Sequence, residues 1–357
     1  MHYHRKSVMV ALAFTIASSI VIFSQLGYQQ ALAVTATPSP APSKTPTNTP
    51  ETNNSDENGT DLSESEDNDR AAQFEPFIQS DLSVLTGNVQ RPNGVIWHND
   101  MLYSSCNGDW TLYELDSTSG STITYSAGVR NAHTLFVEGE SSQSLDIWLP
   151  DYDVNAVVRV RGLQSSPSVV AGDIEGPWGI AYFDEESFLV TSLLGDRILQ
   201  VSRDGEVNEV VSGLRSPAGI AVTDEYVFVA NNGSSRRSIE WISRDDLLDS
   251  NTPTVEPLVS GLQSTTGVVY AEDAYLYFAY AVGTRGVVGR VNPEVCIEQG
   301  GCTNDQIEIV LYTELPAPLA GLTVSPDMRL FVHTIYRPEI YWVEIPYSED
   351  VIDEQES

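Results

Sequence analysis

Short apolar stretches separated by polar turns recur along the chain from about residue 92 to residue 345. Five copies begin with a glycine ahead of the first apolar stretch: Gly94, Gly179, Gly219, Gly267 and Gly321. These glycines lie 85, 40, 48 and 54 residues apart. The first interval is twice the usual length and contains a divergent copy, "NAHTLFVEGESSQSLDIWLPD", in which His133 replaces the glycine. The pattern therefore indicates six repeated units.

Each unit is long enough for four short strands. Third strands are readable in several units as "TLYELD", "AVVRVRG", "RILQVSR", "SIEWISR" and "EIYWVEI". A sheet this small buries both faces only when it stacks against similar sheets around a ring. We therefore predict an all-β fold, a six-bladed β-propeller, over residues 72–348. The last unit lacks an outer strand, and "SDLSVLTGNV" (residues 80–89) is predicted to supply it and close the ring.

The N-terminal segment does not follow the repeat pattern. A basic start, an apolar run and the small-residue sequence "ALA" at 31–33 predict a signal peptide over 1–33, and an uncleaved membrane anchor is the alternative. Residues 34–71 are rich in Pro, Thr and Ser and then in acids, which predicts a disordered tether; residues 349–357 form an acidic tail. We expect an exported bacterial protein, either secreted or tethered to the cell surface.

The formal net charge of -32 limits the partners. Nucleic acids and anionic lipids select basic surfaces, so we expect neither as a partner. Membrane contact would then occur only through an uncleaved N-terminal segment. We expect a monomer that binds a small molecule or a protein.

The chain has three cysteines, two of them in the short sequence "CIEQGGC". In an exported protein this spacing predicts a disulfide between Cys296 and Cys302, with glycines that allow the tight turn. Cys106 lies in a predicted inner strand, where we expect it to be buried and free.

The segment "GPWGIAYFDEESFLVTSLLGDRILQVSRDGEV" (residues 176–207) resembles NHL-repeat propellers. The whole repeat pattern also resembles the family of gluconolactonase, regucalcin and paraoxonase-like lactonases. The second resemblance implies a divalent ion such as calcium at the mouth of the central channel. "RPNG" places Asn93, and "IEGPW" places Glu175, at two of that family's metal-ligand positions. The family's "PDG" aspartate is missing, and Trp178 stands one position earlier than the family tryptophan.

The residue just before each glycine, and the residue before His133 in the divergent unit, are predicted to face the channel mouth. These positions are Asn93, Ala132, Trp178, Ala218, Thr266 and Ala320. Three alanines offer space without charge, whereas Trp178, Thr266, Asn93 and the neighbouring Asn131 and His133 offer an aromatic face and polar contacts. His133 is also a candidate general base.

Common hydrolase, kinase and dehydrogenase motifs are absent from the sequence. We therefore predict an extracytoplasmic ligand- or protein-binding module that needs no cofactor. The alternative is a calcium-dependent lactonase or esterase that uses Asn93 and Glu175 as metal ligands.

Overall fold

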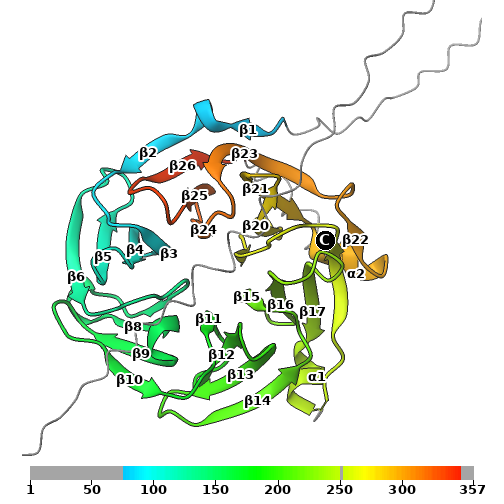
Figure 1. Cartoon of the computed structure of the whole chain (residues 1–357), viewed down its shortest axis with the longest axis horizontal. Helices are drawn as coiled ribbons and strands as arrows, with labels where there is room; N and C mark the ends of the chain where they lie inside the picture. Colours follow the sequence, from blue (N-terminus) through cyan, green and yellow to red (C-terminus); the bar gives the residue numbers. More distant parts are fainter. Residues whose placement is uncertain (1–74, 250–251, 347–357) are drawn as a thin grey trace, which may run out of the picture. The chain divides into compact units, whose positions relative to one another are not determined.

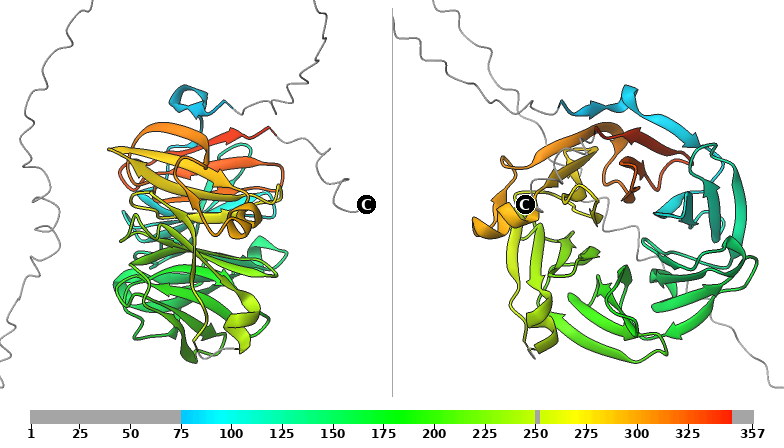
Figure 2. Two further views of the ribbon diagram at one scale, coloured as in Figure 1. Left: turned by 90° about the vertical axis from the view of Figure 1, so that its right-hand side faces the viewer. Right: turned by 180° about the vertical axis from the view of Figure 1, so that it is seen from behind.

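Six sheets stand around a central axis in the computed structural model, which describes residues 75–249 and 252–346 (Figure 1). Figure 2 shows the same ring edge-on and from behind. The fold is an all-β six-bladed propeller, as the repeat pattern predicts. The expected signal peptide, tether and acidic tail lie outside the described residues. Within the described part, no helix has the length and apolarity needed to cross a membrane.

Each blade is built from consecutive antiparallel strands. Blade 1 contains β3 (Pro92–His98), β4 (Met101–Cys106), β5 (Thr111–Asp116) and β6 (Thr122–Ala127); blade 2 contains β7 (Phe136–Glu138), β8 (Asp146–Asp151), β9 (Ala156–Arg161) and β10 (Ser168–Ala171); blade 3 contains β11 (Pro177–Tyr182), β12 (Ser187–Ser192), β13 (Arg197–Ser202) and β14 (Val207–Ser212). Blade 4 contains β15 (Pro217–Val222), β16 (Tyr226–Asn231), β17 (Ile239–Ser243) and β18 (Glu256–Ser260); blade 5 contains β19 (Val268–Tyr270), β20 (Leu276–Val282), β21 (Arg285–Val291) and β23 (Glu308–Pro316); blade 6 contains β24 (Gly321–Val324), β25 (Arg329–His333) and β26 (Ile340–Glu344).

The ring is closed by the segment that precedes the first repeat. Strand β2 (Ser83–Thr86) pairs antiparallel with β26 and forms the outer strand of blade 6. The predicted closure is therefore confirmed, and the edge of β26 is covered.

Two further strands join neighbouring blades in a way that the repeat pattern did not predict. Strand β1 (Phe77–Ile78) pairs in parallel with β23 of blade 5, and the 3-10 helix η1 (Gln79–Asp81) leads from it to β2. Strand β22 (Cys302–Thr303) leaves blade 5 and pairs in parallel with β18 of blade 4. The same insertion contains α2 (Pro293–Glu298), and the predicted Cys296–Cys302 disulfide closes it. Cys106 is free and buried, as expected.

Three short helices fill other connections. The 3-10 helices η2 (Ser142–Ser144) and η3 (Tyr152–Val154) lie on either side of β8, and α1 (Arg244–Asp249) follows β17.

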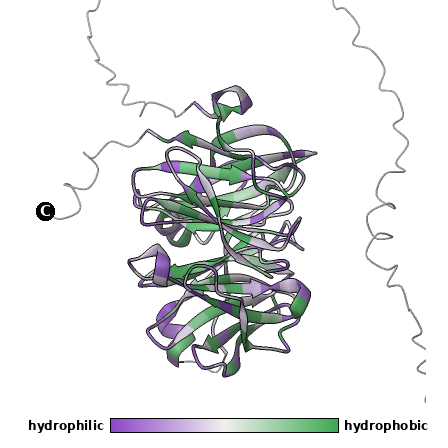
Figure 3. Cartoon of the chain, turned by 90° about the vertical axis from the view of Figure 1, so that its left-hand side faces the viewer, coloured by the Kyte–Doolittle hydropathy of each residue, from purple (hydrophilic) through white to green (hydrophobic). Residues whose placement is uncertain are grey.

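The hydrophobic core is divided among the contacts between blades. Six clusters of buried residues occur in the described part, and each combines side chains from two adjacent blades. Figure 3 shows hydrophobic residues concentrated along the strands. Because every blade buries both faces against a neighbour, the repeats are stable only as a ring.

The recurring glycines of the repeats have a steric cause at the inner strands. A Cβ on Gly179 would lie 2.4 Å from the Ala218 carbonyl oxygen, and one on Gly219 would lie 2.8 Å from the Thr266 carbonyl oxygen. The glycines therefore allow neighbouring inner strands to approach closely, and this approach narrows the channel.

Hydroxyl groups tie the blades together near the channel. Ser105 donates to the Ala132 carbonyl, Thr134 to that of Trp178, Thr191 to that of Ala218 and Thr266 to that of Leu319. Trp97 N donates to Thr323 Oγ1 between blades 1 and 6, and Gly219 N donates to the Thr266 carbonyl between blades 4 and 5. These bonds fix the inner strands that form the candidate site.

Candidate functional site

The two ends of the ring differ in which connections they carry. The inner strands β3, β11 and β15 begin at one end, where the loops between the second and third strands of each blade also gather. Backbone hydrogen bonds join the two kinds of segment there, from Asn107 N to the Arg91 carbonyl (3.1 Å) and from Tyr152 N to the Asn131 carbonyl (2.9 Å). We call this end the mouth end and the opposite one the far end.

A cavity of about 270 Å³ lies on the central axis and is lined by residues from all six blades. Its walls are mostly apolar. They comprise Val95, Ile96, Trp97, His133, Thr134, Leu135, Trp178, Ile180, Ile220, Thr266, Gly267, Val268, Val269, Ala320, Gly321, Leu322 and Thr323. In this channel cavity, apolar walls therefore surround a few polar groups.

His133 and Trp178 form the most distinctive contact in the channel cavity. Their rings stack with centroids 3.4 Å apart and planes 6° from parallel. Tyr152 meets both rings edge-on, at 6.3 Å from His133 and 6.0 Å from Trp178. The stack joins blades 2 and 3, so it presents a rigid aromatic surface.

The His133 imidazole is held in its neutral form. Burial, followed by the nearby His333, lowers the pKa of His133 to about 3. Its Nδ1 atom is buried and has no hydrogen-bond partner among the described residues. A neutral imidazole can accept a hydrogen bond at one ring nitrogen and donate one at the other.

His333 is a second histidine near the channel that the site prediction did not include. Its side chain is fully buried in β25, and burial lowers its pKa to about 3. Neither of its ring nitrogens makes a hydrogen bond of good geometry within the described part. Its ring packs against Gly321, since a Cβ added to that glycine would lie 3.1 Å from the His333 Nε2 atom.

Asn93 and Asn131 belong to a polar network beside the channel cavity and do not line it. Asn93 is 1% exposed and its amide nitrogen donates to Asn131 Oδ1. Asn131 in turn donates to Asp153 Oδ1 (2.8 Å). Buried Asp151 accepts hydrogen bonds from the backbone of Arg130 and Asn131, while burial raises its pKa. The network fixes the loop that carries His133.

The other expected mouth residues divide between the cavity wall and the protein interior. Thr266 and Ala320 line the channel cavity, although the Thr266 hydroxyl is already bonded to the Leu319 carbonyl (2.8 Å). Ala132 and Ala218 are buried against neighbouring blades and do not line it.

Glu175 is directed away from the position that a calcium site would require. Its carboxylate pairs with Arg197 at 3.1 Å, its side chain is 64% exposed, and it does not line the channel cavity. The Asn93 Oδ1 atom is buried without a partner, but no carboxylate from the expected set meets it. Within residues 75–249 and 252–346, no group of three His, Cys, Asp or Glu side chains could hold a metal ion. The residues present therefore do not fit the expected calcium site, which needs six to eight oxygen ligands.

Unpaired arginines gather at the mouth end. Six exposed arginines form no ion pair with another described residue: Arg91, Arg130, Arg215, Arg236, Arg285 and Arg337. All six lie in mouth-end connections or at the first residue of a third strand. Arg91 and Arg130 stand two residues before mouth positions, and Arg130 also lies 5.4 Å from the centre of the exposed Trp110 ring.

The far end carries most of the acidic turns. These turns contain Asp100, Asp116, Asp184, Glu185, Glu186, Asp204, Glu206, Asp224, Glu225, Asp245, Asp246, Asp249, Glu272, Asp273, Glu294, Glu298 and Asp327. The molecule is therefore electrically polarised along the channel axis, and an anion approaching it meets the weakest repulsion at the mouth.

The fold and cavity define a six-bladed propeller with an axial site, and known propellers share this architecture. A gluconolactonase from Xanthomonas campestris matches with a TM-score of 0.56 and 14% identity, covering 74% of this chain and 89% of that one. A calcium-binding protein, regucalcin, from Agrobacterium tumefaciens matches with a TM-score of 0.55 and 13% identity, covering 75% and 95%. A streptogramin B lyase matches with a TM-score of 0.52 and 18% identity, covering 73% and 96%.

These similarities confirm the expected resemblance to the gluconolactonase and regucalcin propellers at the level of fold. At identities this low they say nothing about activity. No family model matches the chain, and no curated protein matches it.

Proposed function

We propose that the propeller is a binding module that takes a ligand, either a small molecule or a loop of a protein partner, at the mouth of its central channel. The stacked His133–Trp178 pair in an apolar cavity is the observation that carries the proposal. Such a surface favours a planar, largely apolar group, since stacking on an aromatic face adds to the burial of apolar area.

The unpaired arginines around the mouth favour a ligand that carries negative charge. Arg91 and Arg130 would attract a carboxylate, sulfate or phosphate at the rim while the planar group enters the channel cavity. The preferred ligand is therefore a ring or aromatic side chain that also carries negative charge.

Isothermal titration calorimetry with 2-naphthoate and its neutral analogue 2-naphthylmethanol tests this proposal. We expect both probes to bind, the anion more tightly. Trp178→Ala should weaken the binding of both probes about fivefold, because loss of one aromatic contact costs about 1 kcal/mol. The double variant Arg91→Gln with Arg130→Gln should weaken the binding of 2-naphthoate and leave that of 2-naphthylmethanol unchanged. Tyr312→Ala, at an exposed site on an outer strand, is the matched control.

Binding that is unchanged in folded Trp178→Ala would refute the mouth as the site. The lactonase alternative makes a different prediction, namely calcium-dependent hydrolysis of dihydrocoumarin that is lost in Asn93→Ala. Because Glu175 pairs with Arg197, we expect no such turnover.

We also propose that the protein acts outside the cytoplasm as a monomer. The sequence of residues 1–33 and the Cys296–Cys302 disulfide support export, because such bonds persist in oxidising compartments. N-terminal sequencing of protein purified from its native cells tests cleavage, which should leave Val34 as the first residue. Light scattering should give a monomer mass, and a dimer mass would contradict the proposal.

A further inference from the structure

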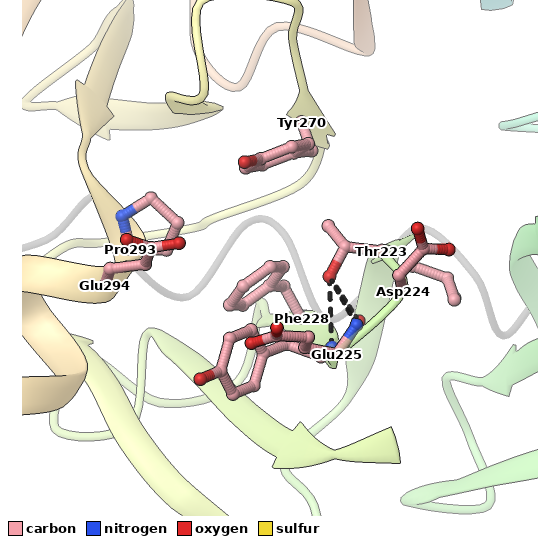
Figure 4. A pocket seen from close by; sticks show the side chains of 9 residues that line it. Thr223, Asp224, Glu225, Phe228, Tyr270, Pro293 and Glu294 are labelled. Carbon is pink, nitrogen blue, oxygen red and sulfur yellow. Dashed lines mark hydrogen bonds between the residues drawn. The ribbon is translucent and has the colours of Figure 1, made fainter. Parts of the chain in front are cut away.

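A second cavity, of about 410 Å³, lies at the far end of the ring between blades 4 and 5 (Figure 4). We call it the tyrosine pocket. It is lined by Val222, Thr223, Asp224, Glu225, Tyr226, Phe228, Tyr270, Pro293 and Glu294. These residues come from the β15–β16 turn, from β16, from the end of β19 and from the start of α2. The pocket is separate from the channel cavity, and no residue lines both.

Aromatic rings form the walls of the tyrosine pocket. Phe228 is fully buried and stacks with Tyr270, with ring centroids 6.5 Å apart and planes 19° from parallel. Tyr226 packs edge-on against Trp241 at 5.4 Å. Tyr270 is 38% exposed, so it offers part of its ring to a ligand. The packing behind these rings holds their faces in place before any ligand arrives.

Carboxylates surround the aromatic walls. Glu225 and Glu294 form no ion pair with another described residue, and the nearest cationic partner of Asp224 is Arg244 at 3.9 Å. Burial, together with the charges of Glu225 and Glu294, raises the pKa of Tyr226 and that of Tyr270. Both carboxylates line the same pocket as the two phenol groups.

The backbone fixes the positions of these acids. Thr223 Oγ1 accepts hydrogen bonds from the backbone of Glu225 and Tyr226, at 3.4 and 3.0 Å, as the dashed lines in Figure 4 show. Asn292 Oδ1 accepts from Glu294 N (3.0 Å) and caps α2, which the disulfide ties to β22.

The cationic group nearest to the pocket is already engaged. The Arg244 guanidinium donates to the carbonyls of Phe183 and Thr223 and lies over the Phe183 ring, 5.0 Å from its centre. The pocket therefore offers aromatic faces and negative charge without a cation of its own.

From this geometry we propose that the tyrosine pocket binds an organic cation, an alkylammonium or guanidinium group, through the faces of Tyr226 and Tyr270 and the carboxylates of Glu225 and Glu294. Cations of this kind are attracted to the negative face of an aromatic ring and gain further from nearby carboxylates. A bare metal ion would need six or more oxygen ligands, which aromatic walls do not provide. The acidic turns of the far end raise the local concentration of any cation.

Titration calorimetry with choline and its neutral isostere 3,3-dimethyl-1-butanol tests the proposal on the intact protein. We expect choline to bind and the isostere to bind at least tenfold more weakly. Tyr270→Leu, and separately Glu225→Gln with Glu294→Gln, should each weaken choline binding roughly three- to tenfold. Matched controls are Tyr312→Leu on an outer strand and Glu272→Gln outside the pocket, which should leave choline affinity unchanged.

The source of the cation is distinguished with two further probes. N-acetyl-lysine methylamide and N-acetyl-arginine methylamide present the same chemistry as peptide side chains, and binding tighter than that of choline would identify a protein segment as the ligand. Weaker binding would identify a free small cation. Equal binding of choline and its isostere, no binding of any cationic probe at 20 mM (roughly 2 kcal/mol of affinity), or full choline affinity in the folded Tyr270→Leu variant would overturn the proposal.

Discussion

The closing strand β2 provides a direct test of how the ring is stabilised. Leu85 of β2 is 8% exposed, and it packs with Val95, Leu102, Phe331 and Ile340 in the cluster between blades 6 and 1. Leu85→Ala removes apolar contacts and leaves a cavity that the surrounding strands fill only partly. Such substitutions cost about 2–4 kcal/mol of unfolding free energy.

The neighbouring residue supplies a matched control. Val84 belongs to the same strand and pairs with Tyr341, but its side chain is 57% exposed. Val84→Ala should therefore change the unfolding free energy by no more than about 0.5 kcal/mol. Calorimetric melting of both variants gives the comparison, and a loss of about 3 kcal/mol corresponds to a fall of roughly 6–12 °C in Tm.

Deletion of residues 72–90 is the extreme form of the same perturbation. It removes β2 and uncovers the edge of β26, so we expect severe destabilisation and aggregation. Equal melting of Leu85→Ala and Val84→Ala, or a truncated protein that melts like the parent, would refute closure by β2 as a source of stability.

Two other predictions concern the cysteines and the histidines. Thiol counting under denaturing, non-reducing conditions should give one free thiol per chain, because Cys296 and Cys302 are joined and Cys106 is free; three thiols would contradict this. The folded pKa of His333, about 3, lies below the unfolded value of about 6.5, so stability is fully present above pH 6.5 and is lost as the pH falls toward 3. Urea unfolding measures the unfolding free energy at pH 7 and at pH 4.5. The loss between these two pH values should be about 2–3 kcal/mol smaller in His333→Gln than in the parent. Equal losses in the two proteins would contradict a buried neutral imidazole.

The sequence predicted the parts of the fold that repeat. Recurring glycines ahead of short apolar runs identified the blades, and the missing outer strand of the last unit identified residues 80–89 as the closing segment. The short strands β1 and β22 were not predicted, since two residues carry no periodic signal. Their pairing depends on the position of the neighbouring blade.

The site was less predictable because its contacts join residues that are far apart in the sequence. His133 and Trp178 were both candidates, but their stacking follows from the curvature of the ring. The family motif suggested Glu175 as a metal ligand, whereas the local sequence also contains Arg197, which pairs with it. The arginines are irregularly spaced along the chain and form one group only when the mouth-end connections come together.

The measurement that tests the central claim most directly is thermal melting of the purified propeller in calcium and in a chelator. We expect no change in Tm with either addition, because Asn93 bonds to Asn131 whereas Glu175 pairs with Arg197. A rise in Tm that saturates at roughly micromolar calcium, and that disappears in Asn93→Ala or Glu175→Gln, would show that the native mouth holds the ion and would contradict the account.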